Sequence, residues 1–219
     1  MGASGGFPVD LVLFGMIAAF LVLRLRSILG RRQGFERTEG ARAAPRAADG
    51  PVIDGVAERT VPTRPLPDPA SPAGQALARM QRTDRGFSPV RFLDGAEQAF
   101  RMIVGAFAAG QRDTLRSLLS PDTYRDFEAA ITAREANRET QRTEVRAVQS
   151  ATIEAADLRG RIADITVRFV TDQVSQTLAA DGSILHGTEA VTEIVDLWTF
   201  ERELGSADPT WRLVAARSA

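Results

Sequence analysis

The hydrophobic periodicity of this chain changes once, and that change constrains the fold more than any other feature. Between residues 88 and 138, apolar side chains recur every three or four positions, as in helices that bury one face. Between residues 145 and 215 they alternate with polar neighbours, as in strands of a sheet with one covered face. A helical block followed by a block of strands predicts an α+β domain.

The helical block contains start and stop signals for three helices. Ser88-Pro89 and Ser120-Pro121 each place a capping hydroxyl before a proline, a combination that favours the first turn of a helix. Gly110 is expected to end the first helix, because glycine readily adopts the left-handed conformation that follows a last turn. The expected buried faces consist of Phe92, Ala96, Phe100, Ile103 and Phe107, then Leu115, Leu118 and Leu119, then Tyr124, Phe127 and Ile131.

Four strands are expected in the second block. The weakest alternation lies at residues 145–151 and the clearest at residues 165–170. Asp181-Gly182 indicates a hairpin tip before a long strand over residues 192–201, and a last strand begins at Trp211. We expect a curved four-stranded antiparallel sheet that wraps the first long helix, giving a cone with a pocket at its open end.

The N-terminal segment has the composition of a membrane anchor. Leu11–Leu23 contains 13 uncharged residues, and Phe7–Leu29 extends this to 23 residues interrupted only by Asp10, Arg24 and Arg26. A helix of this length spans a bilayer, and the arginine side chains can extend to the headgroups. No basic residue precedes the apolar run, which argues against a secretory signal. An interfacial helix lying on the bilayer is the alternative interpretation.

A basic block follows directly after this apolar run. Between Arg24 and Arg46 there are seven arginines and two glutamates. Positive charge is retained on the cytoplasmic side, so the N-terminus is expected outside and the main domain in the cytoplasm of a bacterial inner membrane. The residues expected to contact anionic phospholipid headgroups are Arg24, Arg26, Arg31 and Arg32.

The sequence predicts five parts, whose boundaries are set by the apolar run, the prolines and the first amphipathic helix of the main domain. Seven prolines between residues 45 and 72 predict an extended, disordered linker that holds the domain away from the membrane. The predicted parts are an N-terminal tip (1–6), a transmembrane helix (7–29), a basic and then proline-rich linker (30–72), a helical arm (73–86) and the main domain (87–219).

Composition excludes several kinds of chemistry. The chain has no cysteine, a single histidine (His186) and no lysine among its 27 basic residues. Disulfides, thiol nucleophiles, a Ser-His-Asp triad and Schiff-base chemistry are therefore not expected, and we assign no catalytic residue, metal or cofactor. From Arg91 onward the chain contains 15 arginines and 20 acidic residues, so this part carries a net negative charge and we do not expect it to bind nucleic acid.

Two spaced blocks in the strand region resemble the C-terminal signature of the Tim44-like domain family. The blocks are Asp196-Leu-Trp198-Thr-Phe200-Glu-Arg202 and Asp208-Pro209-Thr-Trp211-Arg-Leu213. The family comprises the motor-anchoring subunit of the mitochondrial inner-membrane translocase and bacterial relatives. The resemblance implies a nuclear-transport-factor-two-like cone with an apolar pocket. It also implies a membrane-bound adaptor that docks a chaperone or a translocating chain and contacts acidic lipid.

The long charged chaperone-contacting arm of the mitochondrial members is replaced here by the proline- and arginine-rich linker. The motor-anchoring role is therefore less directly implied than the fold.

Large aromatic side chains are the candidates for a pocket that binds a partner. A core role is the competing interpretation, because aromatic residues on a strand face usually pack inside. Asp196 shares its expected face with Trp198, and we expect it to pair with Arg168 or Arg202. The candidate pocket residues are Phe107, Tyr124, Phe169, Asp196, Trp198, Phe200 and Trp211.

Three functions follow from these features. The first is a non-enzymatic, membrane-anchored adaptor that binds a protein partner, which is a membrane or translocating protein or a chaperone, through an apolar pocket. The second is a membrane tether that binds anionic lipid or an acyl chain. The third, more remote, is a small-molecule isomerase or hydratase that uses Asp196 as a general base, which burial would favour by raising its pKa.

Overall fold

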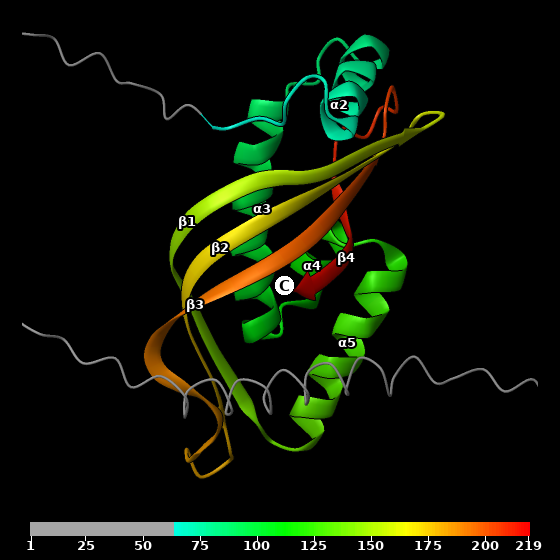
Figure 1. Cartoon of the computed structure of the whole chain (residues 1–219). Coiled ribbons are helices and arrows are strands. Elements are labelled where there is room, and N and C mark those ends of the chain that lie inside the picture. The colour runs from blue at the N-terminus through cyan, green and yellow to red at the C-terminus, as the bar shows by residue number, and fades with distance from the viewer. Residues whose placement is uncertain (1–63) are drawn as a thin grey trace, which may run out of the picture. The chain divides into compact units, whose positions relative to one another are not determined.

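A computed structural model describes residues 64–219. This part of the chain contains four helices followed by four strands (Figure 1). The helices are α2 (Pro72–Thr83), α3 (Pro89–Ala109), α4 (Arg112–Leu118) and α5 (Pro121–Ala136), and the strands are β1 (Thr140–Arg159), β2 (Ile162–Leu178), β3 (Ile184–Glu203) and β4 (Arg212–Ser218).

The α+β class and the order of its two halves are confirmed. Two predicted helix starts are confirmed: the Ser88 and Ser120 hydroxyls cap α3 and α5, and proline occupies the first turn. Ser71-Pro72 begins α2 in the same way. Asp113, expected from the sequence to cap the short helix between α3 and α5, lies instead in the first turn of α4, whose N-cap residue is Gln111. Gly110 follows α3 with φ of 68°, the left-handed conformation expected of it.

The four strands form one antiparallel sheet in the order β1-β2-β3-β4. The three long strands bow around α3 (Figure 1), and hairpins join them at Gly160 and around Asp181-Gly182. β1 is much longer than residues 145–151. Register shifts between Val145 and Ala147 and between Val148 and Ser150 interrupt its alternation, so its sequence pattern is weak.

One face of the sheet packs against α3 and forms the core. Ile165, Val167 and Phe169 alternate along β2 with half-exposed residues on the other face. Phe100 of α3 lies between two aromatic side chains of the sheet, with ring centroids 4.6 Å from Phe169 and 4.5 Å from Trp198. The centre of the fold is therefore filled with aromatic side chains.

The segment predicted as a helical arm is α2, and it packs against the domain. Ala76 and Met80 are fully buried, and α2 contacts β1. Asp84, which follows α2, pairs with Arg202 of β3. The helix is thus held to the sheet by apolar burial and by an ion pair.

No helix within residues 64–219 has the length and hydropathy needed to cross a bilayer. The predicted membrane helix (7–29), the four arginines expected at lipid headgroups and most of the predicted linker lie outside the described residues.

Candidate functional site

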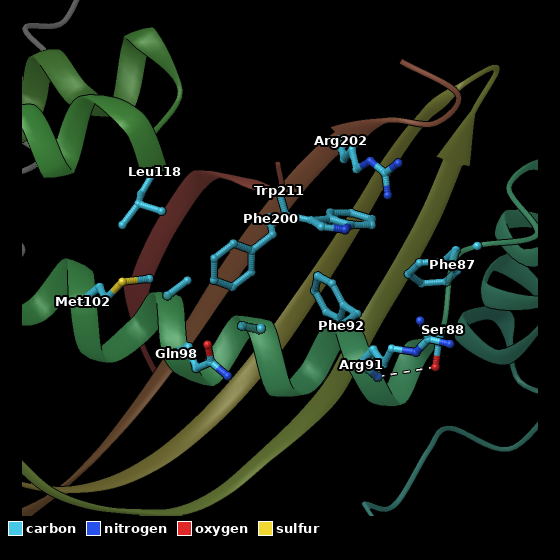
Figure 2. Close-up of a pocket in the computed structure, with 14 residues that line it drawn as sticks. Phe87, Ser88, Arg91, Phe92, Gln98, Met102, Leu118, Phe200, Arg202 and Trp211 are labelled. Atoms are coloured by element: carbon cyan, nitrogen blue, oxygen red, sulfur yellow. Dashed lines mark hydrogen bonds between the residues drawn. The ribbon is translucent and has the colours of Figure 1, made fainter. Parts of the chain in front are cut away.

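An apolar groove runs along the first half of α3 and opens to solvent (Figure 2). Its volume is about 320 Å³. The loop before α3, one side of α3 itself, the end of β3 and Trp211 just before β4 supply its walls, together with Leu118 of α4. The groove is therefore built from segments far apart in sequence.

Four aromatic side chains form the floor of the groove. Phe92 lies at the centre, with its ring centroid 4.8 Å from Trp211, 6.1 Å from Phe200 and 6.4 Å from Phe87. Phe87 also packs on Trp211 at 5.8 Å. The rings hold one another in place through these edge-to-face and tilted contacts, so the floor is preformed.

The wall along α3 combines one large apolar residue with small ones. Met102 is 48% exposed, which is unusual for a large apolar side chain on a long core helix. Gly95 lines the same wall, and a Cβ placed there would meet nothing within 4 Å. Small residues on this side of α3 keep the groove open, and methionine provides an adaptable rim. Of the floor residues, Trp211 is half-buried, whereas Phe87, Phe92 and Phe200 are buried and present only a small part of their rings.

The loop from α2 to α3 positions the Phe87 end of the groove. The Asp84 carboxylate accepts a hydrogen bond from the Gly86 amide at 2.8 Å, and the Asp84 carbonyl accepts one from the Phe87 amide at 3.0 Å. The Arg202 Nη2 donates to the same carboxylate at 3.1 Å. One acidic residue therefore fixes the loop and the arginine on the opposite wall. No residue of α2 itself lines the groove, so this helix leaves it open.

Two of the seven candidate residues from the sequence line this groove, namely Phe200 and Trp211. Two others, Phe169 and Trp198, are core residues: Phe169 is fully buried and Trp198 is 6% exposed. Trp198 packs against Phe200 at 6.3 Å, so it supports the groove floor from inside without lining it.

Phe107, near the C-terminal end of α3, and Tyr124 of α5 do not line the groove. Phe107 packs on Phe127 of α5 at 5.0 Å, and the Arg134 guanidinium lies 5.3 Å from its ring. The Tyr124 hydroxyl donates to Glu128 at 2.7 Å and accepts from Arg116 at 2.9 Å. The bond to Glu128 raises the pKa of Tyr124, with burial adding to the effect. Both residues thus connect helices to one another.

Asp196 does not form the ion pair that we expected. Ser218 of β4 donates to its carboxylate at 3.1 Å, and among the described residues no arginine forms a salt bridge with it. Asp196 pairs across the strands with Phe169, so these two side chains share a face of the sheet. Arg168 is the next residue to Phe169 on β2 and therefore points to the opposite face. Arg202 is bound to Asp84 instead.

Burial raises the pKa of Asp196, and the hydrogen bond from Ser218 opposes this effect. A general base needs a substrate beside it, yet Asp196 does not line the groove. The described residues also contain no cluster of three or more histidine or acidic side chains placed to hold a metal ion. The structure therefore provides no support for the isomerase hypothesis at this residue.

A second hollow, of about 580 Å³, lies at the C-terminal half of α3; it has a larger polar share than the groove and no aromatic lining residue. Gly105, Ala108 and Ala109 face charged and amide side chains of β1 and β2 there. We place the candidate site in the first groove, because ligand sites typically combine an apolar lining with a few polar groups.

The larger groove residues that the sequence analysis did not propose as site residues include Phe87, Arg91, Phe92, Met102, Leu118 and Arg202. Phe92 was assigned to the core face of α3, and it does lie in the core while one side of its ring meets the groove. The signal that could have found the site is Met102, an apolar residue on the otherwise small or polar side of α3 that Gly95 and Ala99 share.

Comparison with curated proteins gave no match. Among solved structures, the intermembrane-space region of the chloroplast protein ARC6 is similar over 57% of this chain and 95% of that chain. The two are 10% identical, with a TM-score of 0.42. The model of the Tim44-like domain matches residues 73–218, from the first turn of α2 to the end of β4. The resemblance carried by the two blocks around Trp198 and Trp211 is therefore confirmed, and the chain belongs to the Tim44-like domain family.

Proposed function

We propose that this protein is a membrane-anchored, non-enzymatic adaptor whose domain binds an apolar segment of a protein partner in the groove on α3. The observation that carries the proposal is a groove with a preformed aromatic cluster at one end and the exposed Met102 at the other (Figure 2). Membership of the Tim44-like domain family supports an adaptor role in protein translocation.

The groove has the properties that capture of an apolar segment requires. Its floor is rigid because its rings pack on one another, so little conformational entropy is lost there on binding. Its rim carries Ser88 and Gln98, which can bond to the backbone of a bound segment. Each apolar side chain buried there contributes about 1.5–3 kcal/mol, so a short segment binds with moderate affinity.

Anchoring to the membrane compensates for moderate affinity. We propose that residues 7–29 span the inner membrane of a bacterium and that the domain lies on the cytoplasmic side, with Arg24, Arg26, Arg31 and Arg32 at anionic headgroups. A tether confines the domain beside the bilayer and raises its effective concentration for membrane or translocating polypeptides. Alkaline extraction of native membranes tests the anchor, since a spanning helix stays in the pellet and an interfacial one is released.

Site-specific photo-crosslinking in native membranes tests the binding function. A photoreactive amino acid at position Met102 is expected to crosslink a polypeptide, because this position forms the rim of the groove. The matched control places the same amino acid at Val191, an exposed apolar position (57%) on β3 outside the groove. Equal products from both positions, or none from Met102, would contradict the proposed site.

A further inference from the structure

The groove differs in charge from the domain that contains it. Residues 64–219 contain 19 arginines and 22 acidic residues, so this part of the chain is acidic. The residues that line the groove include two arginines, Arg91 and Arg202, and no aspartate or glutamate. Figure 2 shows the two arginines on opposite sides of Phe92 and Trp211. The apolar floor is thus flanked by two arginines, of which Arg202 is paired with Asp84.

The two arginines differ in how far their charge is compensated. Arg91 is exposed, and it forms no salt bridge with any residue in the described range. Arg202 is 14% exposed; its Nη2 bonds to Asp84, and its Nε is buried with no hydrogen-bond partner in the structure. The Arg202 charge is thus offset by Asp84, whereas the exposed Arg91 guanidinium is free to bind a carboxylate of a ligand.

The start of α3 adds to this positive potential. Its first turn contains no acidic residue, although acidic residues are favoured there by the helix dipole, and Arg91 occupies that turn instead. A cation at this place is unfavourable for the helix itself. Because Arg91 also lines the groove, its side chain is placed to bind a negatively charged group of a ligand there.

We infer that the groove prefers a peptide segment in which an acidic residue stands among apolar ones, and that it disfavours basic segments. The inference rests on the proposed function and adds to it the charge of the partner. Like charges opposed across an interface reduce affinity, so a lysine beside Arg91 is penalised while an aspartate is favoured. The volume of about 320 Å³ is at the lower end of ligand pockets, which suits a short segment better than a two-chain lipid.

The test uses the 219-residue chain in mild detergent and three labelled peptides. The peptides share the same leucine and phenylalanine residues and differ only in a central Asp, Asn or Lys. Dissociation constants from fluorescence polarisation are expected to rise in that order, with about a tenfold difference between the Asp and Lys peptides. Arg91→Glu is expected to reverse the order. Arg79→Glu makes the same charge change at an exposed position of α2 outside the groove and is expected to preserve it.

The outcomes separate this inference from the function on which it rests. Equal affinities for the three peptides, or an order that Arg91→Glu leaves unchanged, would overturn the charge preference while peptide binding itself would still support the adaptor. Absence of binding for all three peptides would overturn both. If phosphatidylglycerol vesicles bound instead, and Arg91→Glu but not Arg79→Glu abolished that binding, the ligand would be anionic lipid and the peptide inference would be wrong.

Discussion

Asp84 and Arg202 form an ion pair, with 3.1 Å between Oδ2 and Nη2, that joins the end of α2 to the wall of the groove. The two side chains are 20% and 14% exposed, so the pair is largely withdrawn from solvent. Because the Asp84 carboxylate also accepts the Gly86 amide, the pair couples the arginine to the loop that presents Phe87. The Asp84 carboxylate therefore links the end of α2 to two parts of the groove, in addition to the apolar burial that holds the helix.

Asp84→Asn is expected to lower the free energy of unfolding by about 1–2 kcal/mol. The substitution leaves the Arg202 charge uncompensated, and the cost is below that of a fully buried pair because both side chains retain some exposure. Urea unfolding of the full chain measures the effect. The control is Asp113→Asn, which breaks a pair with Arg116 on the surface, where Asp113 is 99% exposed. An equal decrease in the free energy of unfolding in both variants would show that the Asp84 pair stabilises the fold no more than a surface pair does.

Phe100→Ala is expected to destabilise the protein by about 3–5 kcal/mol, because it removes a fully buried ring from between Phe169 and Trp198. Met102→Ala, two positions further along α3, is expected to cost much less because that side chain is 48% exposed. Thermal unfolding compares the two. Similar losses would mean that the centre of the domain is not the packed core described here.

Asp196→Asn is expected to change the pH dependence of stability. Burial raises the pKa of Asp196 in the folded protein, so folding favours its protonated form. Above the ordinary pKa of about 3.9, the folded state therefore binds more protons at this site than the unfolded chain does. Its contribution to stability falls as pH rises through the folded pKa.

The amide of the variant does not titrate, so the stability of Asp196→Asn relative to the wild type should increase with pH above about 4 and level off once the native carboxyl is ionised. Urea unfolding at a series of pH values provides the measurement. Ser218→Ala is the companion variant: it removes the hydrogen bond that favours the carboxylate and should steepen the wild-type trend. Parallel profiles for Asp196→Asn and wild type would contradict the raised pKa.

The helices were predictable because their signals are local. A serine followed by proline, as at Ser88, and a glycine after the last turn, as at Gly110, act through the backbone of a few neighbouring residues. The hairpin at Asp181-Gly182 has the same origin. The length of β1 was less predictable. Each bulge shifts the following residues to the other face of the sheet, so no single alternation of apolar and polar residues runs along the whole strand.

The groove was less predictable because its walls meet only in the folded chain. Trp211 was a candidate from the sequence, yet nothing local indicates that Met102 and Leu118 lie on the same hollow. The expected pairing of Asp196 failed for a geometric reason. Arg168 points to the other face, and Arg202 is six residues along β3, which is about 20 Å in a strand.

The most direct test of the account fills the groove without disturbing the core. Gly95→Leu adds a side chain where a Cβ meets nothing within 4 Å and where the residue lines the groove. Gly105→Leu is the matched control, since it makes the same change on the same helix, also where a Cβ meets nothing within 4 Å, but in the second hollow and outside the groove. Both replace glycine in a helix, so neither is expected to destabilise α3.

Binding of the apolar peptide with a central Asn to the full chain is the measurement. If Gly95→Leu displaces about one apolar side chain, worth about 1.5–3 kcal/mol, affinity should fall by about tenfold to a hundredfold. Gly105→Leu should bind as the wild type does. Unchanged affinity in Gly95→Leu, or an equal loss in both variants, would contradict the assignment of this groove as the partner-binding site.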